Sequence, residues 1–356
     1  MKESSLILRN FKGVVDSTLR EGLQFSRANF SLAQQKKIFR YLARINVDYV
    51  EVGNPVRSEV REMIVQIIRC KNSVSPKILA HVRNNKSDVQ RAIDCGVDGV
   101  NILCTADPER LEAMRQAPRA YLKSLEQNIL LAKSQRQEVR ISVEDSFHQP
   151  KRLSAIVYDL ADALQVERIG LADTLGKTLS WDVYRRVRTL RLRVHADIEG
   201  HFHNDLGHAV SNAVSALTAG ANWIDTSLLG IGERTGITPL SSLLINLYIL
   251  DPEFGERYNL GLLTAAENYV SKICHIEMPM NLATNRRNGF AHKAGIHLDA
   301  LIRFGPHKYE ALAPQVIGNG RHLLTGSLVS GKTSSEDVEA FRKKYSPESL
   351  ASRPGT

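Results

Sequence analysis

Two histidines separated by a single residue, His201 and His203, form the pair in this sequence with the clearest potential for chemistry. Side chains alternate along a β-strand, so residues two apart point to the same face of a sheet. Residues 194–199 favour the start of a strand, and Asn204 and Gly207 favour its end. The pair is therefore predicted at the carboxyl tip of a strand, where two imidazoles either bind one metal ion or form ordinary hydrogen bonds.

The elements that must position this pair follow a regular order. Short apolar or β-branched segments alternate with amphipathic helical ones, and the predicted strands are 13–19, 48–53, 77–83, 99–105, 138–145, 168–174, 197–204 and 223–230. Strict alternation indicates a parallel sheet, and eight β-α units are the number that closes a (β/α)8 TIM barrel. A doubly wound open sheet is the alternative, but no Gly-x-Gly-x-x-Gly turn follows an early strand.

The helical segments between the strands carry apolar residues at helical spacing. Examples are 31–45, 87–95, 122–133, 152–164, 180–192 and 209–219, and 240–250 is predicted as the last helix of the barrel. Ser31 and Ser180 are predicted to cap two of these helices, because a serine hydroxyl accepts hydrogen bonds from free backbone N–H groups of the first turn.

The pattern changes at about residue 251, where helical segments become shorter and are interrupted by Pro279, Asn281 and Asn285. We therefore predict a catalytic barrel over 1–250 and a small, mainly helical region over 251–345. The polar segment 346–356 is predicted to be a disordered tail.

Composition favours a soluble globular protein of 356 residues, with 43% hydrophobic and 24% charged residues. The four cysteines have no C-x-x-C spacing, which argues against a zinc knuckle and a disulfide framework and favours a reducing, cytoplasmic compartment. The first eight residues lack the features of a secretory leader, and no apolar segment reaches about 18 residues. Neither secretion nor membrane insertion is predicted.

The formal net charge of +9 raises the question of nucleic-acid binding. Basic residues are spread over helical segments such as 184–193, where apolar positions between them indicate an ordinary solvated helix face. Aromatic residues make up only 6% of the chain and do not alternate with the basic ones. We predict no nucleic-acid partner, and expect the charge to attract anionic small molecules.

Polar residues gather where a barrel places its chemistry, at the carboxyl ends of strands. Six of the eight predicted strand ends carry ionisable or hydroxyl groups, within 16–24, 81–83, 140–145, 172–176, 201–205 and 230–236. A shared pocket explains all six together. Glu21 would complete a two-histidine, one-carboxylate metal set with His201 and His203. Arg20 and Arg140 suit bidentate binding of carboxylates, and a metal chelated by a 2-oxo acid would polarise its carbonyl.

Four motifs resemble those of the metal-dependent Claisen-condensing enzymes that include homocitrate synthase and isopropylmalate synthase. They are Asp-Ser-Thr-Leu-Arg-Glu-Gly-Leu-Gln at 16–24, His-Phe-His-Asn-Asp at 201–205, Gly-Ile-Gly-Glu-Arg-Thr-Gly-Ile-Thr-Pro at 230–239 and His-Lys-Ala-Gly-Ile-His at 292–297. The resemblance extends from about residue 13 to about residue 334. It implies a barrel followed by small helical subdomains, in a domain-swapped homodimer whose partner chain helps to close each active site.

The same resemblance implies roles for individual residues. The metal ligands would be Glu21, His201 and His203, and the groups that contact the 2-oxo acid would be Arg20, Gln24, Arg140, Ser142 and Thr174. Glu144 and His297 would enolise acetyl-CoA with help from Tyr309, and the partner subunit would supply His297 and Tyr309. The acetyl methyl carbanion would attack the ketone of the 2-oxo acid, and thioester hydrolysis would follow.

Within the family, the motifs favour homocitrate synthases. Gly236 is followed by Ile237, where isopropylmalate synthases have asparagine, and His81 with Arg83 matches the His-x-Arg that reads the distal carboxylate of 2-oxoglutarate. Asn101 stands where homocitrate synthases have an aspartate paired with that histidine, which makes a protonated His81 less favourable.

A second departure is Asn54-Pro-Val-Arg57, where the family usually has Ser-Pro-Val-Ala. Because both departures concern the part of the pocket that selects the substrate, oxaloacetate, pyruvate, 2-oxoisovalerate and a phosphonate-bearing 2-oxo acid remain alternatives. Two imidazoles and a carboxylate suit magnesium, manganese, zinc and other divalent ions, so the sequence does not identify the metal.

Two other functional classes compete with this one. Residues 326–333 satisfy the P-loop pattern G-x-x-x-x-G-K-[ST], but only 23 residues follow Thr333, too few for the helix and acidic strand that a nucleotide site needs. A non-catalytic binding module would be expected to have lost a ligand or a base. The candidate metal ligands and acid–base residues are all present: Glu21, His201, His203, Glu144 and His297. We therefore interpret the chain as an enzyme.

Overall fold

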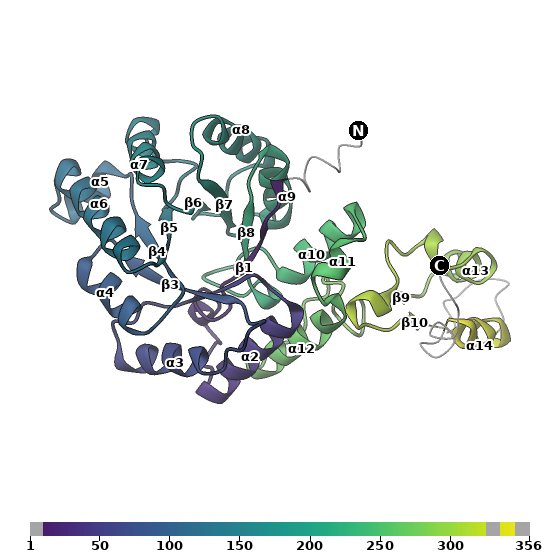
Figure 1. The fold of residues 1–356 in the computed structure, drawn as a ribbon. Helices are drawn as coiled ribbons and strands as arrows, with labels where there is room; N and C mark the ends of the chain where they lie inside the picture. The colour runs from purple at the N-terminus through teal and green to yellow at the C-terminus, as the bar shows by residue number, and fades with distance from the viewer. Residues whose placement is uncertain (1–9, 325–334, 346–356) are drawn as a thin grey trace. The chain divides into compact units, whose positions relative to one another are not determined.

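Eight parallel strands form a closed barrel in the computed structural model, which describes residues 10–324 and 335–345 (Figure 1). The strands are β1 (Gly13–Asp16), β2 (Tyr49–Val52), β3 (Lys77–Arg83), β4 (Gly99–Cys104), β5 (Glu138–Val143), β6 (Arg168–Asp173), β7 (Asp197–Phe202) and β8 (Trp223–Thr226). β1 pairs with both β2 and β8, so the sheet has no open edge. The predicted TIM barrel is confirmed, and the alternative of a doubly wound open sheet is wrong.

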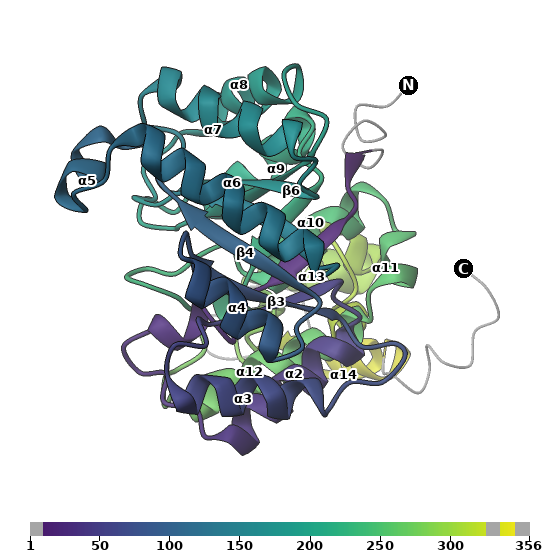
Figure 2. The ribbon, with the colours of Figure 1, turned by 60° about the vertical axis from the view of Figure 1, so that its left-hand side comes forward.

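Helices form the outer layer of the barrel, and Figure 2 shows α4 and α6 lying over β3 and β4. The helices of this layer are α2 (Leu32–Ile45), α3 (Ser58–Ile68), α4 (Lys86–Asp94), α5 (Pro108–Ala113), α6 (Pro118–Ser134), α7 (Lys151–Ala163), α8 (Ser180–Arg191), α9 (Ala209–Ala219) and α10 (Leu240–Leu250). No helix among the described residues is long and apolar enough to cross a membrane.

The predicted helix caps have different outcomes. Ser31 caps α2 as expected: its hydroxyl accepts from the backbone N–H of Gln34, whose side chain accepts from the backbone of Ser31 in return. Ser180 does not cap α8, because the helix begins at Ser180 itself and Leu179 occupies the cap position. The hydroxyl of Ser180 instead donates to Asn212 Oδ1 on the neighbouring α9, 2.9 Å away.

The predicted strands begin close to the observed positions, and all except β3 were predicted to end too late. The segment 13–19 was expected to be extended throughout, whereas β1 ends at Asp16, whose carboxylate accepts from the backbone N–H of Thr18 at 2.9 Å and turns the chain. Likewise β8 ends at Thr226, and the apolar residues that follow form a short 3-10 turn, η2 (Leu228–Gly230). At β1, the carboxylate of Asp16 thus ends the strand and begins the loop that carries Arg20, Glu21 and Gln24.

The chain divides into two compact units. The first runs to Tyr258 and includes α11 (Phe254–Arg257) and Ile273–His275, and the second comprises Asn259–Lys272 and the described residues from Ile276 onward. Most of α12 (Leu263–Ile273) belongs to the second unit, followed by α13 (Gly295–Phe304), α14 (Ser335–Lys344) and a parallel pair of short strands, β9 (Ala291–His292) and β10 (His322–Leu323).

A small apolar core holds part of the second unit together. Its buried members come from α13, β10 and α14, and they are Leu298, Leu301, Leu323, Val338 and Phe341. The predicted tail 346–356 and the P-loop match at 326–333 lie outside the described residues.

Candidate active site

A cavity of about 200 Å³ opens among the carboxyl ends of the barrel strands, and we call it the barrel-mouth cavity. Ten of its lining residues are ones that the sequence predicted for the site: Arg20, Glu21, Gln24, His81, Arg140, Ser142, Glu144, Thr174, His201 and His203. Leu103, Gly170, Leu171 and Ala172 complete the lining. All of these residues belong to the barrel unit.

Glu21, His201 and His203 form a cluster in which one ligand atom from each lies within 4.8 Å of the others. All three side chains are buried, and the Nε2 atoms of the two histidines face one another at 3.3 Å. Burial lowers the pKa of His203 to about 4, so its ring is neutral at pH 7 and keeps a free nitrogen lone pair. Two imidazoles and a carboxylate in this arrangement fit a divalent metal ion.

The carboxylate of the cluster is ionised. Burial alone would raise the pKa of Glu21, but the positive charge of Arg20 outweighs it and lowers that pKa. The backbone N–H of Glu233 also donates to Glu21 Oε1 at 2.9 Å. Glu21 is therefore held in the charged form that a metal ligand requires.

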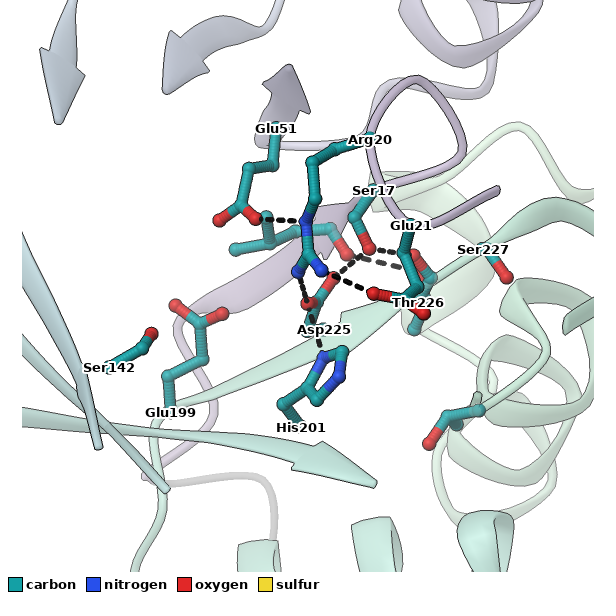
Figure 3. Close-up of polar contacts among 12 residues, drawn as sticks. Ser17, Arg20, Glu21, Glu51, Ser142, Glu199, His201, Asp225, Thr226 and Ser227 are labelled. Atoms are coloured by element: carbon teal, nitrogen blue, oxygen red, sulfur yellow. Dashed lines mark hydrogen bonds and ion pairs between the residues drawn. The ribbon is translucent and has the colours of Figure 1, made fainter. Parts of the chain in front are cut away.

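Asp225 on β8 orients the metal-ligand candidate His201 from behind. Its Oδ2 lies 2.7 Å from His201 Nδ1, and Ser17 donates to its other oxygen at 2.7 Å (Figure 3). This contact fixes the ring and leaves Nε2 directed at the cluster. Sequence reasoning missed Asp225. Its position near the carboxyl end of β8, the strand that pairs with β7, could have indicated a partner for His201.

Arg20 forms ion pairs with three carboxylates around the barrel-mouth cavity. Its Nε donates to Glu51 Oε1 at 2.7 Å, its Nη1 pairs with Glu21, and its Nη2 lies 3.5 Å from Asp225 (Figure 3). The side chain is 11% exposed, and these three contacts fix the plane of its guanidinium.

Below the cavity lies a buried layer of charges that the sequence reading did not foresee. Arg140 Nη1 donates to Glu51 Oε2 at 2.7 Å and lies 2.8 Å from Glu199 Oε1, and Arg168 donates to the other oxygen of Glu199 at 3.3 Å. Burial raises the pKa of Glu199 to about 7, against the opposing effect of the two arginines. The signal for this layer was the presence of charged residues within strands, at Glu51, Arg168 and Glu199.

His81 and Asn101 meet because β3, β4 and β5 pair in register, with His81 opposite Asn101 and Asn101 opposite Arg140. Asn101 Nδ2 donates to Glu51 Oε2 at 2.9 Å and lies 3.0 Å from His81 Nδ1, while Ser142 donates to Asn101 Oδ1 at 2.8 Å. An ionised Glu51 only accepts hydrogen bonds, so it fixes the amide nitrogen of Asn101 toward itself and His81.

His81 lies among polar and charged groups. Its Nδ1 is 3.0 Å from Asn101 Nδ2 and 3.2 Å from Glu51 Oε1, which also accepts from Arg20. Burial, and then the charge of Arg20, lower the pKa of His81, so the ring is neutral.

The remaining predicted residues lie in different surroundings. Glu144 pairs with Arg110 at the cavity rim, and Thr174 Oγ1 accepts from a backbone N–H at 2.8 Å. Arg83 is not brought to the cavity: its side chain is 65% exposed and its Nε lies 2.6 Å from the buried carboxylate of Asp88 in the first turn of α4. That carboxylate is a partner which the sequence reading overlooked.

His297 and Tyr309 belong to the second unit, where their rings stack with centroids 3.9 Å apart. Glu310, next to Tyr309, accepts from Arg321 through both carboxylate oxygens, at 2.5 and 2.6 Å, and lies 3.1 Å from His292 Nε2. The segment that carries Tyr309 is therefore anchored by a bidentate ion pair.

Comparison with known proteins identifies the family. A model of the HMGL-like family matches residues 13–270, and a model of the homocitrate synthase post-HMGL domain-like family matches residues 286–348. The mitochondrial homocitrate synthase of Schizosaccharomyces pombe is 40% identical over 91% of this chain and 77% of its own length. The cytosolic homocitrate synthase isozyme of Saccharomyces cerevisiae is 37% identical, over 91% of this chain and 76% of its own.

An archaeal relative extends the comparison: homocitrate synthase AksA of Methanothermobacter thermautotrophicus is 32% identical over 91% of this chain and 83% of its own length. Among solved structures, the HMG-CoA lyase of Bacillus subtilis has a TM-score of 0.68 at 18% identity, covering 76% of this chain and 96% of that one. The HMG-CoA lyase of Brucella melitensis has a TM-score of 0.65 at 18% identity, covering 75% and 99%. These two likenesses concern the fold.

The closed barrel, its polar mouth and the region after it define a TIM-barrel enzyme with a family-specific C-terminal part. The chain belongs to the HMGL-like family, and the relatives that match most of its length are homocitrate synthases. The resemblance stated from the motifs is confirmed, and so is the prediction of an enzyme from this group of acetyl-CoA-dependent condensing enzymes.

Proposed function

We propose that this chain condenses acetyl-CoA with 2-oxoglutarate and water to give homocitrate and free CoA. The single observation that carries the proposal is the barrel-mouth cavity, which brings a metal-ligand triad, a fixed guanidinium and the carboxylate of Glu144 to one place. The names of relatives that match about nine-tenths of the chain support the choice of reaction.

Glu21, His201 and His203 are the residues that would hold a divalent ion, which when bound polarises the ketone of the 2-oxo acid. Magnesium, manganese and zinc all suit this donor set. Arg20 would bind the carboxylate next to the ketone, assisted by Gln24, Arg140, Ser142 and Thr174. The neutral imidazole of His81 would contact the distal end of the substrate, a role that the sequence also assigned to Arg83.

The proton transfers fall to acid–base residues. We assign Glu144, together with His297 of the partner subunit, as the acid–base residues that remove the proton from the acetyl methyl group. Tyr309 of the partner subunit would assist them. The resulting carbanion forms the new C–C bond at the ketone carbon, the ketone oxygen gains a proton, and water cleaves the thioester to release CoA. A positioned base contributes about 10²–10⁴-fold to such a step.

Exposure in the second unit is consistent with a domain-swapped homodimer. Tyr309 is 42% exposed and Ile296, beside His297, is 73% exposed. An imidazole and a phenol stacked at a surface are available to another chain, and a C2 dimer would use each of them twice.

Thiol release with a panel of 2-oxo acids tests the proposal. The panel comprises 2-oxoglutarate, oxaloacetate, pyruvate, 2-oxoisovalerate and phosphonopyruvate, each with acetyl-CoA and magnesium, manganese or zinc. We expect release with 2-oxoglutarate and its loss in His203→Ala, with circular dichroism confirming that this variant is folded. If no 2-oxo acid releases CoA with any of the metals, the proposed function is wrong.

The compartment stays a prediction. The relatives include enzymes named mitochondrial and one named cytosolic, and all four cysteines are free thiols. Localisation of a tagged full chain would test the cytoplasmic placement expected from the cysteines.

A further inference from the structure

A second cavity in the barrel unit, of about 590 Å³, is larger than the barrel-mouth cavity and strongly basic. We call it the basic groove; the loop after β5, the loop after β6 and helix α8 line it, and its residues are Phe147, His148, Gln149, Lys151, Lys177, Thr178, Leu179, Asp182, Arg185, Arg186 and Thr189. Its volume falls in the range of small-molecule sites, about 300–1,000 Å³.

The charges of the basic groove are unbalanced. Asp182 is its only carboxylate and pairs with Arg185. Within the described residues, no carboxylate pairs with Lys151, Lys177 or Arg186. Three cations are therefore left to face a ligand, which favours an anionic one.

Donors in the groove point to phosphate in particular. Arg186 lines the groove, and its guanidinium lies 6.0 Å from the centroid of the Tyr158 ring. The planar guanidinium presents several N–H donors in a geometry that matches phosphate oxygens. Helices α7 and α8, of 13 and 12 residues, begin at Lys151 and Ser180 beside the groove, and helix N-termini add backbone N–H groups and a favourable dipole for anions.

The groove and the barrel-mouth cavity share two loops. Glu144 lines the barrel-mouth cavity and Phe147 the groove; on the next loop, Thr174 lines the cavity and Lys177 the groove. Three residues of fully extended chain span at most about 11 Å. A long, flexible ligand can therefore place one end in each.

We propose that the basic groove binds the phosphates at the nucleotide end of acetyl-CoA, while the thioester lies in the barrel-mouth cavity beside Glu144. This inference rests on the proposed function, since it assigns a place to one of its substrates. Acetyl-CoA has the required shape, because its long pantetheine arm separates a neutral, reactive thioester from an anionic 3′-phosphorylated ADP. Lys177 and Arg186 would bind the phosphates, and neither touches the reacting atoms.

The test compares two acyl donors in two charge-matched variants of the full chain. Lys177→Ala/Arg186→Ala removes two cations of the groove, and Arg40→Ala/Arg44→Ala removes two exposed cations of α2, which follows the first strand. With acetyl-CoA, kcat/KM of the groove variant should fall roughly 10- to 100-fold, mainly through KM, while the α2 variant stays near wild type.

With acetyl-pantetheine, which lacks the nucleotide, both variants should differ little from wild type, because no phosphate interaction is left to lose. The loss with acetyl-CoA should also shrink at high ionic strength, since salt screens charges. An equal loss with both donors, or no loss with acetyl-CoA, would overturn the assignment.

A binding experiment separates this inference from the proposed reaction. Calorimetry with adenosine 3′,5′-bisphosphate should show binding to wild type that weakens in the groove variant, and the same compound should inhibit competitively against acetyl-CoA. If it binds the groove without competing, the groove serves a separate phosphorylated molecule and the assignment to acetyl-CoA is wrong. If neither acyl donor is consumed with any 2-oxo acid, the proposed function is wrong. In that case, bisphosphate binding to wild type that is lost in the groove variant would still identify the groove as a phosphate site.

Discussion

At the scale of single residues, the orientation of the candidate metal ligand His201 depends on Asp225, a residue that does not line the barrel-mouth cavity. Asp225 orients His201 through a 2.7 Å contact to Nδ1 and is itself held by Ser17. Asp225→Asn keeps the shape but removes the negative charge behind the ring, so we expect a 10- to 100-fold loss of metal affinity. Equilibrium dialysis with manganese measures this, and the exposed Asp159→Asn is the control. Unchanged affinity would show that Asp225 does not support the site.

Asn101 provides a second prediction at this scale, because its amide nitrogen lies 3.0 Å from Nδ1 of the neutral His81. In Asn101→Asp the new carboxylate raises the pKa of His81, so the ring becomes cationic below the raised value and neutral above it. We expect kcat/KM for 2-oxoglutarate relative to pyruvate to rise about tenfold as the pH falls through that value, an effect absent in wild type. NMR titration of His81 checks the cause, with Arg20, Glu51 and Arg140 as the charged groups facing it. An unshifted titration would contradict the argument.

These residues also show how far the sequence could lead. The place of Glu21, His201 and Arg20 in the barrel-mouth cavity could be predicted, because residues at the carboxyl ends of barrel strands meet at one mouth. Glu51 and Glu199 could not, since a buried charge is stable only beside its partner, and the partners Arg140 and Arg168 become neighbours only through the register of the barrel.

At the scale of elements, apolar periodicity located the helices and strand starts but not the strand ends. The ladder stops where a polar side chain bonds to the backbone, as Asp16 does with Thr18, and hydrophobicity does not report such turns. The capping box of α2 is the local signal that did locate a boundary, because Ser31 and Gln34 satisfy each other's backbone.

That box yields a stability prediction. Ser31→Ala removes the acceptor for the backbone N–H of Gln34, so the free energy of unfolding should fall by about 1 kcal/mol. Ser31→Asp keeps an acceptor and places a negative charge at a helix N-terminus, so it should remain close to wild type. Urea unfolding of the three proteins measures the difference, and equal destabilisation by both substitutions would show that the cap contributes nothing.

At the scale of the whole molecule, counting eight β-α units was enough to predict closure, because a parallel sheet of that number leaves no edge once its ends pair. Assembly is a different matter, since it depends on surfaces and not on periodicity. Glu144 belongs to the barrel unit and the stacked His297–Tyr309 pair to the second unit, so the proposed acid–base set is divided between them.

Subunit complementation tests whether two chains share each site. Glu144→Ala and His297→Ala chains should each be inactive alone. In a heterodimer, the barrel of the His297→Ala chain keeps Glu144 and receives His297 of the partner subunit. One of the two active sites of the heterodimer is therefore intact. Random exchange of equal amounts makes half of the dimers mixed, so activity should recover to about a quarter of the wild-type value per site. If mixed dimers form, as native mass spectrometry of a tagged pair would show, and activity stays absent, then each chain uses its own His297 and the exchange between subunits is excluded.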